Sequence, residues 1–345
     1  MSGDPLRVLM AAWNYPLPSE TYIETERRFL DSRAQTLVVA HGGPGPEVTP
    51  DHGTFVAAPS RWRLRRMLRE YAPDVVHIHW GMTAGWGVQI ARRAGVPWTL
   101  RTHSFDVLVR PDAEIREVAA LANDSDCLAV LGFPFAKPIL ERAGLKAEKF
   151  TETFPVADVA RFRSDGPKGE AVLSFGALQE RKAVAAAAFA QLSRLVPDLD
   201  FHHHPMGHGT RDELRAQMRA IVEREDGRVE IRDWVPHPDM PAVWGQHRWF
   251  VYPGPLHQGF GWPVGIVEAW AAGVGVCIQR IRPDIEQYVA DAAILFDDIN
   301  ELPPLLKEPP DPDMLARARA RAETMDIGRH GDRLLELWRA AGLPT

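Results

Sequence analysis

The chain has 345 residues, which at about 150 residues per domain predicts two domains, each large enough to bury a core of its own. Its formal net charge of −6 at pH 7 argues against nucleic acid as the main partner. The 2 cysteines, Cys127 and Cys277, lie far apart, which excludes a disulfide scaffold and a zinc site of the Cys-x-x-Cys kind and suits a reducing cytosol.

The hydropathy of the chain predicts a cytoplasmic protein. The apolar run from Val8 to Trp13 is too short for the core of a signal peptide, and no cleavage pattern follows it. No apolar stretch reaches the roughly 18 residues that a membrane-spanning helix needs.

Short apolar runs alternate with amphipathic segments in the first half, which is typical of α/β proteins with parallel sheets. The segment 18–30 is predicted to be a helix, in which Thr21 and Glu24 have the spacing of a capping box. The predicted strands of this half are residues 6–11, 36–40, 75–79, 99–102 and 127–131.

The same alternation restarts near Ala171, after a polar, turn-forming segment at residues 160–169 that we interpret as a linker. The predicted strands of the second half are residues 171–175, 199–203, 229–232, 249–252 and 274–279, and the predicted helices are 183–195, 210–225 and 330–341. We therefore expect a first Rossmann-like domain, a second one and a C-terminal helix, at residues 1–163, 168–328 and 329–345. Two such domains imply a cleft, and a ligand is expected beyond the carboxyl ends of the strands.

The stretch from His257 to Val276 carries the densest chemical signal in the sequence. Its glycines follow a predicted strand and open a helix, whose free N–H groups and positive dipole end suit a diphosphate. Glu268, in the early turns of this helix, can accept hydrogen bonds from ribose hydroxyls. Taken alone, the pattern is more typical of a Gly-rich turn followed by a solvated glutamate.

This stretch, with Gly-Phe-Gly at 259–261 and Ile-Val-Glu-Ala-Trp-Ala-Ala-Gly at 266–273, resembles the donor-site motif of retaining glycosyltransferases of family 4. Other segments resemble that family in the same order: Ser-Glu-Thr-Tyr-Ile at 19–23, Pro-Asp-Val-Val-His-Ile-His at 73–79, Thr-His-Ser-Phe-Asp at 102–106, Gly-Ala-Leu…Lys at 176–182, Gly-His-Gly at 207–209 and Trp-Val-Pro-His-Pro-Asp-Met at 234–240. The resemblance covers most of the chain. It implies the GT-B fold, with two Rossmann-like domains that face an inter-domain cleft, the first for the acceptor and the second for the nucleotide sugar.

The resemblance also implies roles for individual residues. Three are expected to be catalytic, namely His103, Lys182 and Glu268. Without the motif context, His103 is more typical of a capped core residue and Lys182 of a solvated surface lysine. Substrate contacts are expected from Ser19, Glu20, Thr21, Asp106, Gly176, Arg181, Gly259, Phe260, Gly261 and Val264. No cofactor and no metal are expected, because cations and backbone N–H groups stabilise the departing nucleoside diphosphate in such enzymes.

Two positions depart from the family pattern. Phe260 stands eight residues before Glu268, where the family has the first glutamate of an E-x7-E pair. Ala177 replaces the arginine of the family's Gly-Arg-Leu phosphate loop. One ligand for a sugar hydroxyl and one phosphate cation are therefore absent, which leaves the donor sugar open and, to a lesser degree, the activity.

We therefore expect a cytoplasmic glycosyltransferase that transfers a sugar with retention from a nucleotide sugar to a hydroxyl of a glycan or of a lipid-linked glycan. A second hypothesis is a catalytically impaired member that binds a nucleotide sugar or a partner enzyme. A third is an unrelated two-domain Rossmann binder, which requires the match of several motifs to be accidental.

The tract His202-His203-His204 resembles a metal site at first sight. Consecutive strand residues point to opposite faces of a sheet, so the three imidazoles cannot all bind one ion. We interpret the tract as a polar strand end.

The segment 61–69 holds five arginines in nine residues. On a helix, Arg61, Arg65 and Arg69 share one face, while Leu64 and Leu68 lie on the other. A solvated helix face is the commoner explanation. Peripheral contact with an anionic membrane surface, where lipid-linked acceptors reside, is the alternative.

Overall fold

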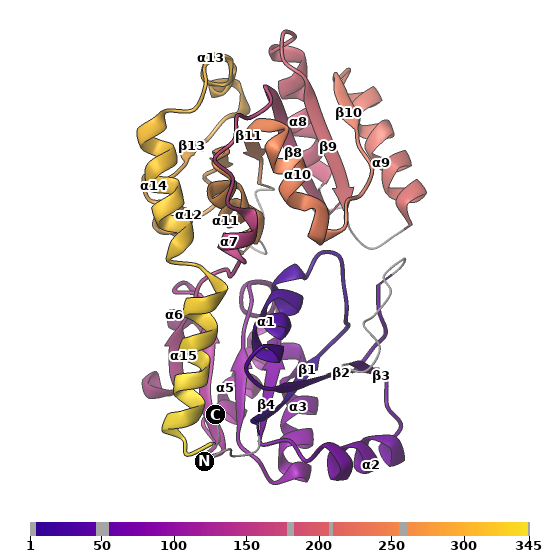
Figure 1. Cartoon of the computed structure of the whole chain (residues 1–345), viewed down its shortest axis with the longest axis vertical. Helices are drawn as coiled ribbons and strands as arrows, with labels where there is room; N and C mark the ends of the chain where they lie inside the picture. The colour runs from indigo at the N-terminus through magenta and orange to yellow at the C-terminus, as the bar shows by residue number, and fades with distance from the viewer. Residues whose placement is uncertain (1–4, 46–54, 178–182, 207–209, 255–260, 344–345) are drawn as a thin grey trace. The chain divides into compact units, whose positions relative to one another are not determined.

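The computed structural model describes residues 5–45, 55–177, 183–206, 210–254 and 261–343 (Figure 1). The chain divides into two compact units, residues 1–156 with 327–345 and residues 157–326. Each unit is built on one parallel sheet with helices around it, so the α/β class expected from the sequence is confirmed.

The described part of the first unit contains a seven-stranded sheet in the order β3-β2-β1-β4-β5-β6-β7, with parallel pairing throughout. The strands are β1 (Arg7–Ala12), β2 (Gln35–Ala40), β3 (Phe55–Ala57), β4 (Val75–His79), β5 (Trp98–Arg101), β6 (Cys127–Gly132) and β7 (Phe150–Glu152). The helices are α1 (Thr21–Asp31), α2 (Arg61–Tyr71), α3 (Gly81–Ala94), α4 (Phe105–Leu108), α5 (Asp112–Ala122), α6 (Ala136–Arg142), the 3₁₀ turn η1 (Ala147–Lys149) and α15 (Ile327–Ala340).

Alternate side chains of the first sheet pack on opposite faces. In β1, Val8 and Met10 belong to a core shared with α1 and α15, whereas Leu9 and Ala11 belong to a core shared with α2, α3 and α5. This alternation follows from the two-residue period of a strand. Both faces are covered, which explains why the strands read as continuous apolar runs.

The described part of the second unit contains a six-stranded parallel sheet in the order β10-β9-β8-β11-β12-β13. The strands are β8 (Ala171–Ala177), β9 (Phe201–Met206), β10 (Val229–Ile231), β11 (His247–Tyr252), β12 (Gly275–Gln279) and β13 (Ile294–Phe296). The helices are α7 (Val159–Phe162), α8 (Ala183–Leu195), α9 (Arg211–Arg224), α10 (Met240–Gly245), α11 (Val264–Ala272), α12 (Asp284–Val289), α13 (Pro303–Lys307) and α14 (Pro312–Glu323), with 3₁₀ turns η3 (His237–Asp239) and η4 (Ile299–Glu301).

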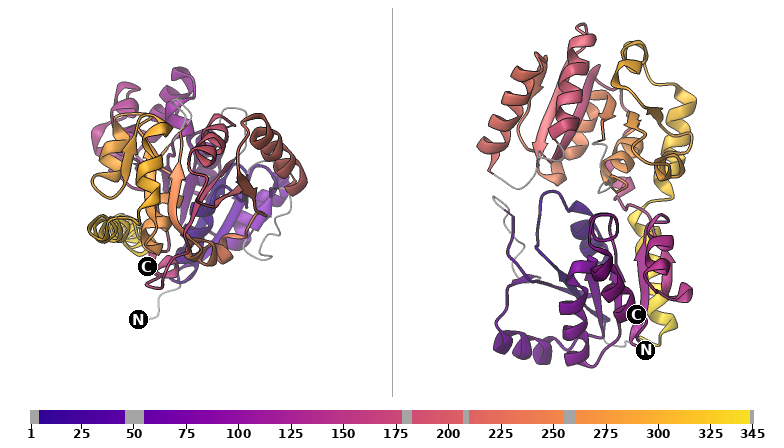
Figure 2. Two further views of the ribbon diagram at one scale, coloured as in Figure 1. Left: turned by 90° about the horizontal axis from the view of Figure 1, so that it is seen from above. Right: turned by 180° about the vertical axis from the view of Figure 1, so that it is seen from behind.

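The C-terminal helix α15 packs on the first unit, as the view from behind in Figure 2 shows. It buries Leu334, Leu335 and Trp338 in the core that also contains residues of α1. Gly331 faces the Phe29 ring, and a Cβ atom on Gly331 would come within 2.0 Å of Phe29 Cε1. The close approach of the two helices therefore depends on a glycine at this position.

The substitution Gly331→Ala is expected to lower the free energy of unfolding by about 1–3 kcal/mol, because the added methyl group displaces Phe29 from its packed position. Gly85→Ala is the matched control, since Gly85 is an exposed helical glycine of α3 with open space around its Cβ position. That control is expected to raise the stability by about 0.5–1 kcal/mol. Urea unfolding of both variants measures the difference, and equal effects would contradict the packing of α15 on α1.

The start of α1 differs from the expectation. The helix begins at Thr21 rather than at residue 18, and its N-cap residue is Glu20, with no side-chain cap. Glu24 does not close a capping box; its carboxylate accepts hydrogen bonds from Arg27 at 2.8 and 2.9 Å, from Arg28 at 2.7 Å and from the Tyr15 hydroxyl. Charge-assisted bonds to two arginines are stronger than a bond to one backbone N–H, so they take the carboxylate away from the cap.

Candidate functional site

In the part of each sheet that the structure describes, the strand order reverses at one point. In the first unit it lies between β1 and β4, and in the second between β8 and β11. Loops that leave the carboxyl ends of such neighbouring strands diverge to opposite faces and form the usual ligand crevice of open α/β sheets. The sequence motifs at residues 176–182 and 259–261 follow β8 and β11, and Trp80 follows β4.

His103 lies just after β5, next to the reversal point of the first sheet. Its side chain is buried, with 4% of the residue exposed, between the Tyr22 ring at 4.6 Å and the Trp80 ring at 4.3 Å. Burial, together with the nearby charge of Arg101, lowers the pKa of His103 well below its ordinary value. His103 is therefore a neutral imidazole at pH 7, which can exchange hydrogen bonds but carries no fixed charge.

Asp106 holds the backbone around His103. Its Oδ1 accepts a hydrogen bond from the His103 N–H at 2.9 Å, and its Oδ2 accepts one from the Gly81 N–H at 2.7 Å. Burial raises the pKa of Asp106 to about 6, against the opposing effect of these two bonds. Asp106 thus ties the loop after β5 to the first turn of α3.

Glu20 is an acid of this region whose pKa is raised. Desolvation raises the pKa of Glu20 to about 7, and the negative charge of Asp106 adds to the shift against the effect of Trp80. Its Oε2 accepts a long hydrogen bond of 3.4 Å from Trp80 Nε1. A carboxyl group with a pKa near neutrality can donate or accept a proton at working pH. Its neighbours Ser19 and Thr21 are exposed and half-buried respectively, and Thr21 O accepts a bond from Thr25.

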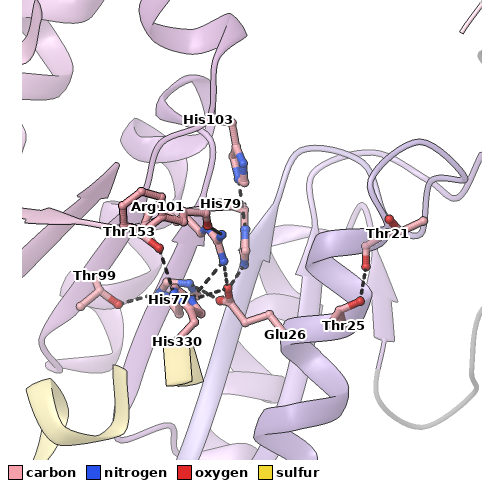
Figure 3. Close-up of polar contacts among 11 residues, drawn as sticks. Thr21, Thr25, Glu26, His77, His79, Thr99, Arg101, His103, Thr153 and His330 are labelled. Carbon is pink, nitrogen blue, oxygen red and sulfur yellow. Dashed lines mark hydrogen bonds and ion pairs between the residues drawn. The ribbon is translucent and has the colours of Figure 1, made fainter. Parts of the chain in front are cut away.

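A buried polar cluster lies beneath His103, centred on the carboxylate of Glu26 (Figure 3). Its Oε1 lies 2.7 Å from His77 Nε2 and 3.3 Å from His79 Nε2. Its Oε2 accepts from Arg101 Nη1 and lies 3.0 Å from His330 Nε2. Burial would raise the pKa of Glu26, but Arg101, His77 and His79 outweigh it and hold the pKa well below its ordinary value. Glu26 is therefore an ionised carboxylate inside the unit.

Glu26, His77 and His79 have the chemistry of metal ligands, and their nearest ligand atoms lie within 4.8 Å of one another. The carboxylate is, however, already paired with the Arg101 guanidinium, which is 1% exposed. A divalent cation bound here would lie beside the buried positive charge of Arg101, and the single carboxylate of Glu26 would have to neutralise both. We therefore interpret the group as a buried ion pair with attached imidazoles.

In the second unit, Glu268 lies in the second turn of α11 and is 4% exposed, so a solvated surface position is excluded. Its Oε1 lies 2.7 Å from Nε2 of His237, a residue of η3. The Phe162 ring packs against His237 at 5.5 Å, and the His237 carbonyl accepts a bond from Arg161. His237 is thus fixed in place and orients the carboxylate of Glu268.

The other expected residues of the second unit lie around α11. Val264 is its first residue, Gly261 precedes it, and Gly176 lies near the end of β8 with open space at its Cβ position. Gly265 has a packing role, since a Cβ there would approach the Phe175 ring to 2.6 Å. The expected residues Arg181, Lys182, Gly259 and Phe260 lie outside the described residues.

The three consecutive histidines of β9 separate as strand geometry predicts. His203 lies on the side of Phe189, with ring centroids 6.1 Å apart, whereas His202 Nδ1 lies 2.8 Å from His247 Nε2. His204 Nδ1 donates to the Asp233 carbonyl at 2.6 Å. The tract is therefore divided between two faces of the sheet.

The sequence interpretation did not single out Glu26, His77, His79 or His237. A signal for two of them was present, because the spacing His-x-His in a predicted strand places both imidazoles on one face. Glu26 gave no local signal, and His237 lies within the family-like segment 234–240 but was not singled out there. Only the packing of α1 on the sheet and of η3 beside α11 brings the two residues to their partners.

None of the helices in the described ranges combines the length and apolar character needed to cross a membrane. The arginines of α2 (61, 63, 65, 66 and 69) are all exposed, and Trp62 of the same helix is 79% exposed. Leu64 and Leu68 face the core, as the amphipathic pattern predicts.

Residues 25–151 match the family model described as Glycosyl transferase 4-like domain. A stretch of 79 residues, 22% of this chain, is 34% identical to the O-antigen chain mannosyltransferase B of Escherichia coli and spans 20% of that protein. Among solved structures, HepE of Anabaena in complex with UDP and glucose aligns with a TM-score of 0.75 at 14% identity, over 97% of this chain and 99% of that one. Sucrose-phosphate synthase of Thermosynechococcus elongatus aligns with a TM-score of 0.73 at 15% identity, again over 97% and 99%. The chain therefore has the fold of these GT-B structures over 97% of its length, as expected, and residues 25–151 are similar to a glycosyl transferase 4-like domain.

Proposed function

We propose that the protein is a glycosyltransferase, which moves a sugar with retention from a nucleotide sugar to a hydroxyl of a glycan or lipid-linked glycan. The observation that carries the proposal is Glu268, a buried carboxylate in the second turn of α11, the helix that follows β11 at the strand reversal of the second sheet. The GT-B fold and the match of residues 25–151 support the reaction class. The UDP and glucose in HepE support a nucleotide sugar as donor, and the O-antigen mannosyltransferase supports a polysaccharide product.

In this proposal Glu268 binds the ribose. His237 holds Oε1, and the carboxylate accepts hydrogen bonds from the two ribose hydroxyls, which every nucleotide donor shares. Lys182 and Arg181 neutralise the diphosphate, together with the N–H groups at the start of α11. These cations do the work that a metal does in other transferases, so we propose that the reaction needs none.

Glu268→Ala is expected to weaken the binding of nucleoside diphosphates and of nucleotide sugars alike, by roughly 10- to 100-fold, because it removes charge-assisted bonds to a group common to all. Glu286→Ala, on the exposed face of α12, is the matched control and is expected to change affinity by less than about 0.5 kcal/mol. Isothermal calorimetry with UDP, GDP and their sugars measures both variants in the presence of EDTA.

An unchanged affinity profile for Glu268→Ala would remove this residue from the nucleotide site. Loss of all binding in EDTA, with recovery in Mg²⁺ or Mn²⁺, would contradict the metal-free proposal. Phe260→Glu, which restores the acid of the family pattern, is expected to alter the preference between sugars and to leave diphosphate affinity nearly unchanged.

A second candidate function rests on Phe260 and Ala177, which replace the acid and the arginine of the family pattern. They favour a member that binds a nucleotide sugar without transferring it. A donor-hydrolysis assay separates the two functions, since turnover supports the transferase and tight binding without turnover supports the binding module.

We also propose that α2 contacts an anionic membrane surface peripherally. Its exposed arginines lie beside Trp62, an amphipathic aromatic residue that is favoured at membrane interfaces. Replacing Arg61, Arg65 and Arg69 by Gln is expected to lower the partition coefficient onto anionic vesicles on the order of 100-fold, at about 1 kcal/mol per charge. Vesicle sedimentation measures this, with uncharged phosphatidylcholine vesicles as the control. Equal binding by the variant would show that α2 is only a solvated face.

A further inference from the structure

We propose that Glu26 and His79 are positioning residues for His103, which fix the nitrogen of its ring that carries the proton. The proposal rests on the proposed function and on the catalytic role that the family resemblance implies for His103. It concerns the chain of contacts Glu26–His79–His103 that Figure 3 shows within the first unit. The three residues come from α1, from β4 and from the loop after β5.

The first residue in this series of contacts, Glu26, carries a buried negative charge. Glu26 is 0% exposed and is paired with Arg101, so its carboxylate is a permanent acceptor. His79 Nε2 lies 3.3 Å from Glu26 Oε1, although the contact is not aligned as a linear hydrogen bond. A lone pair at this nitrogen would face the carboxylate and be repelled, whereas an N–H dipole is attracted. Glu26 therefore selects the tautomer of His79 with the proton on Nε2.

The tautomer of His79 in turn determines which ring nitrogen of His103 carries the proton. Burial lowers the pKa of His79 to about 4, against the raising effect of Glu26, so His79 carries a single ring proton at pH 7. With that proton on Nε2, His79 Nδ1 is an acceptor, and it lies 3.4 Å from His103 Nε2. His103 must then donate from Nε2, which leaves the lone pair on its Nδ1. That nitrogen accepts a hydrogen bond from a substrate hydroxyl.

Glu26 also favours a proton on Nε2 of the neighbouring His77. His77 Nε2 lies 2.7 Å from Glu26 Oε1, and His77 Nδ1 lies 2.7 Å from Thr99 Oγ1, which can donate to it. The charged and titratable groups that face His79 and His103 from the surrounding elements are Glu26, His77, Arg101, Tyr22 and Asp106. Glu20 is bonded to Trp80 Nε1, and the Trp80 ring packs against His103. Among these described groups, the carboxylate of Glu26 lies 3.3 Å from His79 Nε2, and the His77 ring packs edge-on against the His79 ring with centroids 4.8 Å apart.

Two substitutions at position 79 separate positioning from packing. The side-chain oxygen of Asn occupies the place of imidazole Nδ1, so His79→Asn keeps an acceptor toward His103. The terminal amide of Gln occupies the place of Nε2, so His79→Gln keeps the contact with Glu26 and loses the acceptor. We expect turnover to fall about tenfold in His79→Gln, with the KM for the nucleotide sugar unchanged, and to be largely retained in His79→Asn.

The ¹⁵N chemical shifts of the His103 ring, assigned by comparison with His103→Gln, report the tautomer without any assay of activity. The expected result is a proton on Nε2 in the wild type and in His79→Asn, and a mixture in His79→Gln. A proton on Nδ1 in the wild type, or an imidazolium at pH 7, overturns the proposal whether or not the protein transfers sugar. The proposal is also overturned if His79→Asn and His79→Gln lose turnover equally and in proportion to their loss of stability. The expected tautomers in a protein without transfer activity would uphold the positioning and refute the proposed function.

Discussion

Replacing His103 by Ala is expected to lower the turnover of glycosyl transfer by 100-fold or more, while the affinity for nucleoside diphosphate stays within about twofold. Removal of a group that exchanges protons or hydrogen bonds with the reacting centre typically costs about 10²–10⁴ in rate. His103 belongs to the first unit, whereas the proposed nucleotide residues belong to the second, so its loss should affect the reaction rather than the binding of the diphosphate.

The neutral state of His103 gives this prediction a second measurable feature. Because burial holds the pKa of His103 well below its ordinary value, no inflection of the rate near pH 6.5 is expected from this residue. Single-turnover kinetics between pH 5.5 and 8 measure the rate, and calorimetry with UDP and GDP measures the affinity. Weakened diphosphate binding with turnover preserved would move His103 away from the reaction centre.

Acidification is expected to destabilise the second unit through His203. Neither ring nitrogen of His203 has a hydrogen-bond partner among the described residues, and burial lowers its pKa to about 3. The folded state therefore binds fewer protons than the unfolded state between about pH 6.5 and pH 3. The stability that comes from this neutral imidazole is complete above pH 6.5 and falls by about 1.4 kcal/mol for each pH unit below it.

His203→Leu removes both the unpaired nitrogens and the titration. It is expected to raise the free energy of unfolding by about 1–3 kcal/mol at pH 7, and by more at pH 5. His247→Leu is the matched control, since His247 is equally buried but donates from Nδ1 to the Val243 carbonyl at 2.7 Å and contacts His202 at 2.8 Å. That control is expected to destabilise the protein at pH 7. Urea unfolding at several pH values compares the variants, and a destabilised His203→Leu would show that the imidazole has a partner.

Most strands could be predicted from the sequence because a buried parallel strand is a short apolar run between turn residues. The runs at 36–40 and 75–79 correspond to β2 and β4 within one residue. The strands β3, β7 and β13 were not predicted; each has three residues and lies at the edge of its sheet. So short a segment has no periodicity of its own, and its pairing depends on the strand beside it. Length alone does not explain the three misses, since β10 is equally short, also lies at an edge, and was predicted at 229–232.

Motifs that follow strands could also be predicted from the sequence, because a Gly-rich turn and the acid after it lie close together along the chain. This is why Glu268 stands out in the stretch 257–276, although its assignment to a donor site also needed the resemblance of the other motifs. His237 could not, since it lies 31 residues away and meets Glu268 only when η3 packs beside α11. Sequence spacing determines contacts within one element, and contacts between elements arise from packing.

The sequence by itself determined the α/β class and the positions of most strands, because both follow from local hydropathy and turn residues. The partners and the ionised state of Glu26, in contrast, depend on the tertiary structure. In the sequence it is one acid of an amphipathic helix, and α1 turns it toward the sheet, where Arg101 and the imidazoles of β4 surround it. A carboxylate stays ionised in a protein interior only when cations and N–H dipoles from other elements offset its desolvation. The partners of Glu26 come from strands and from a helix, up to 304 residues away in the sequence.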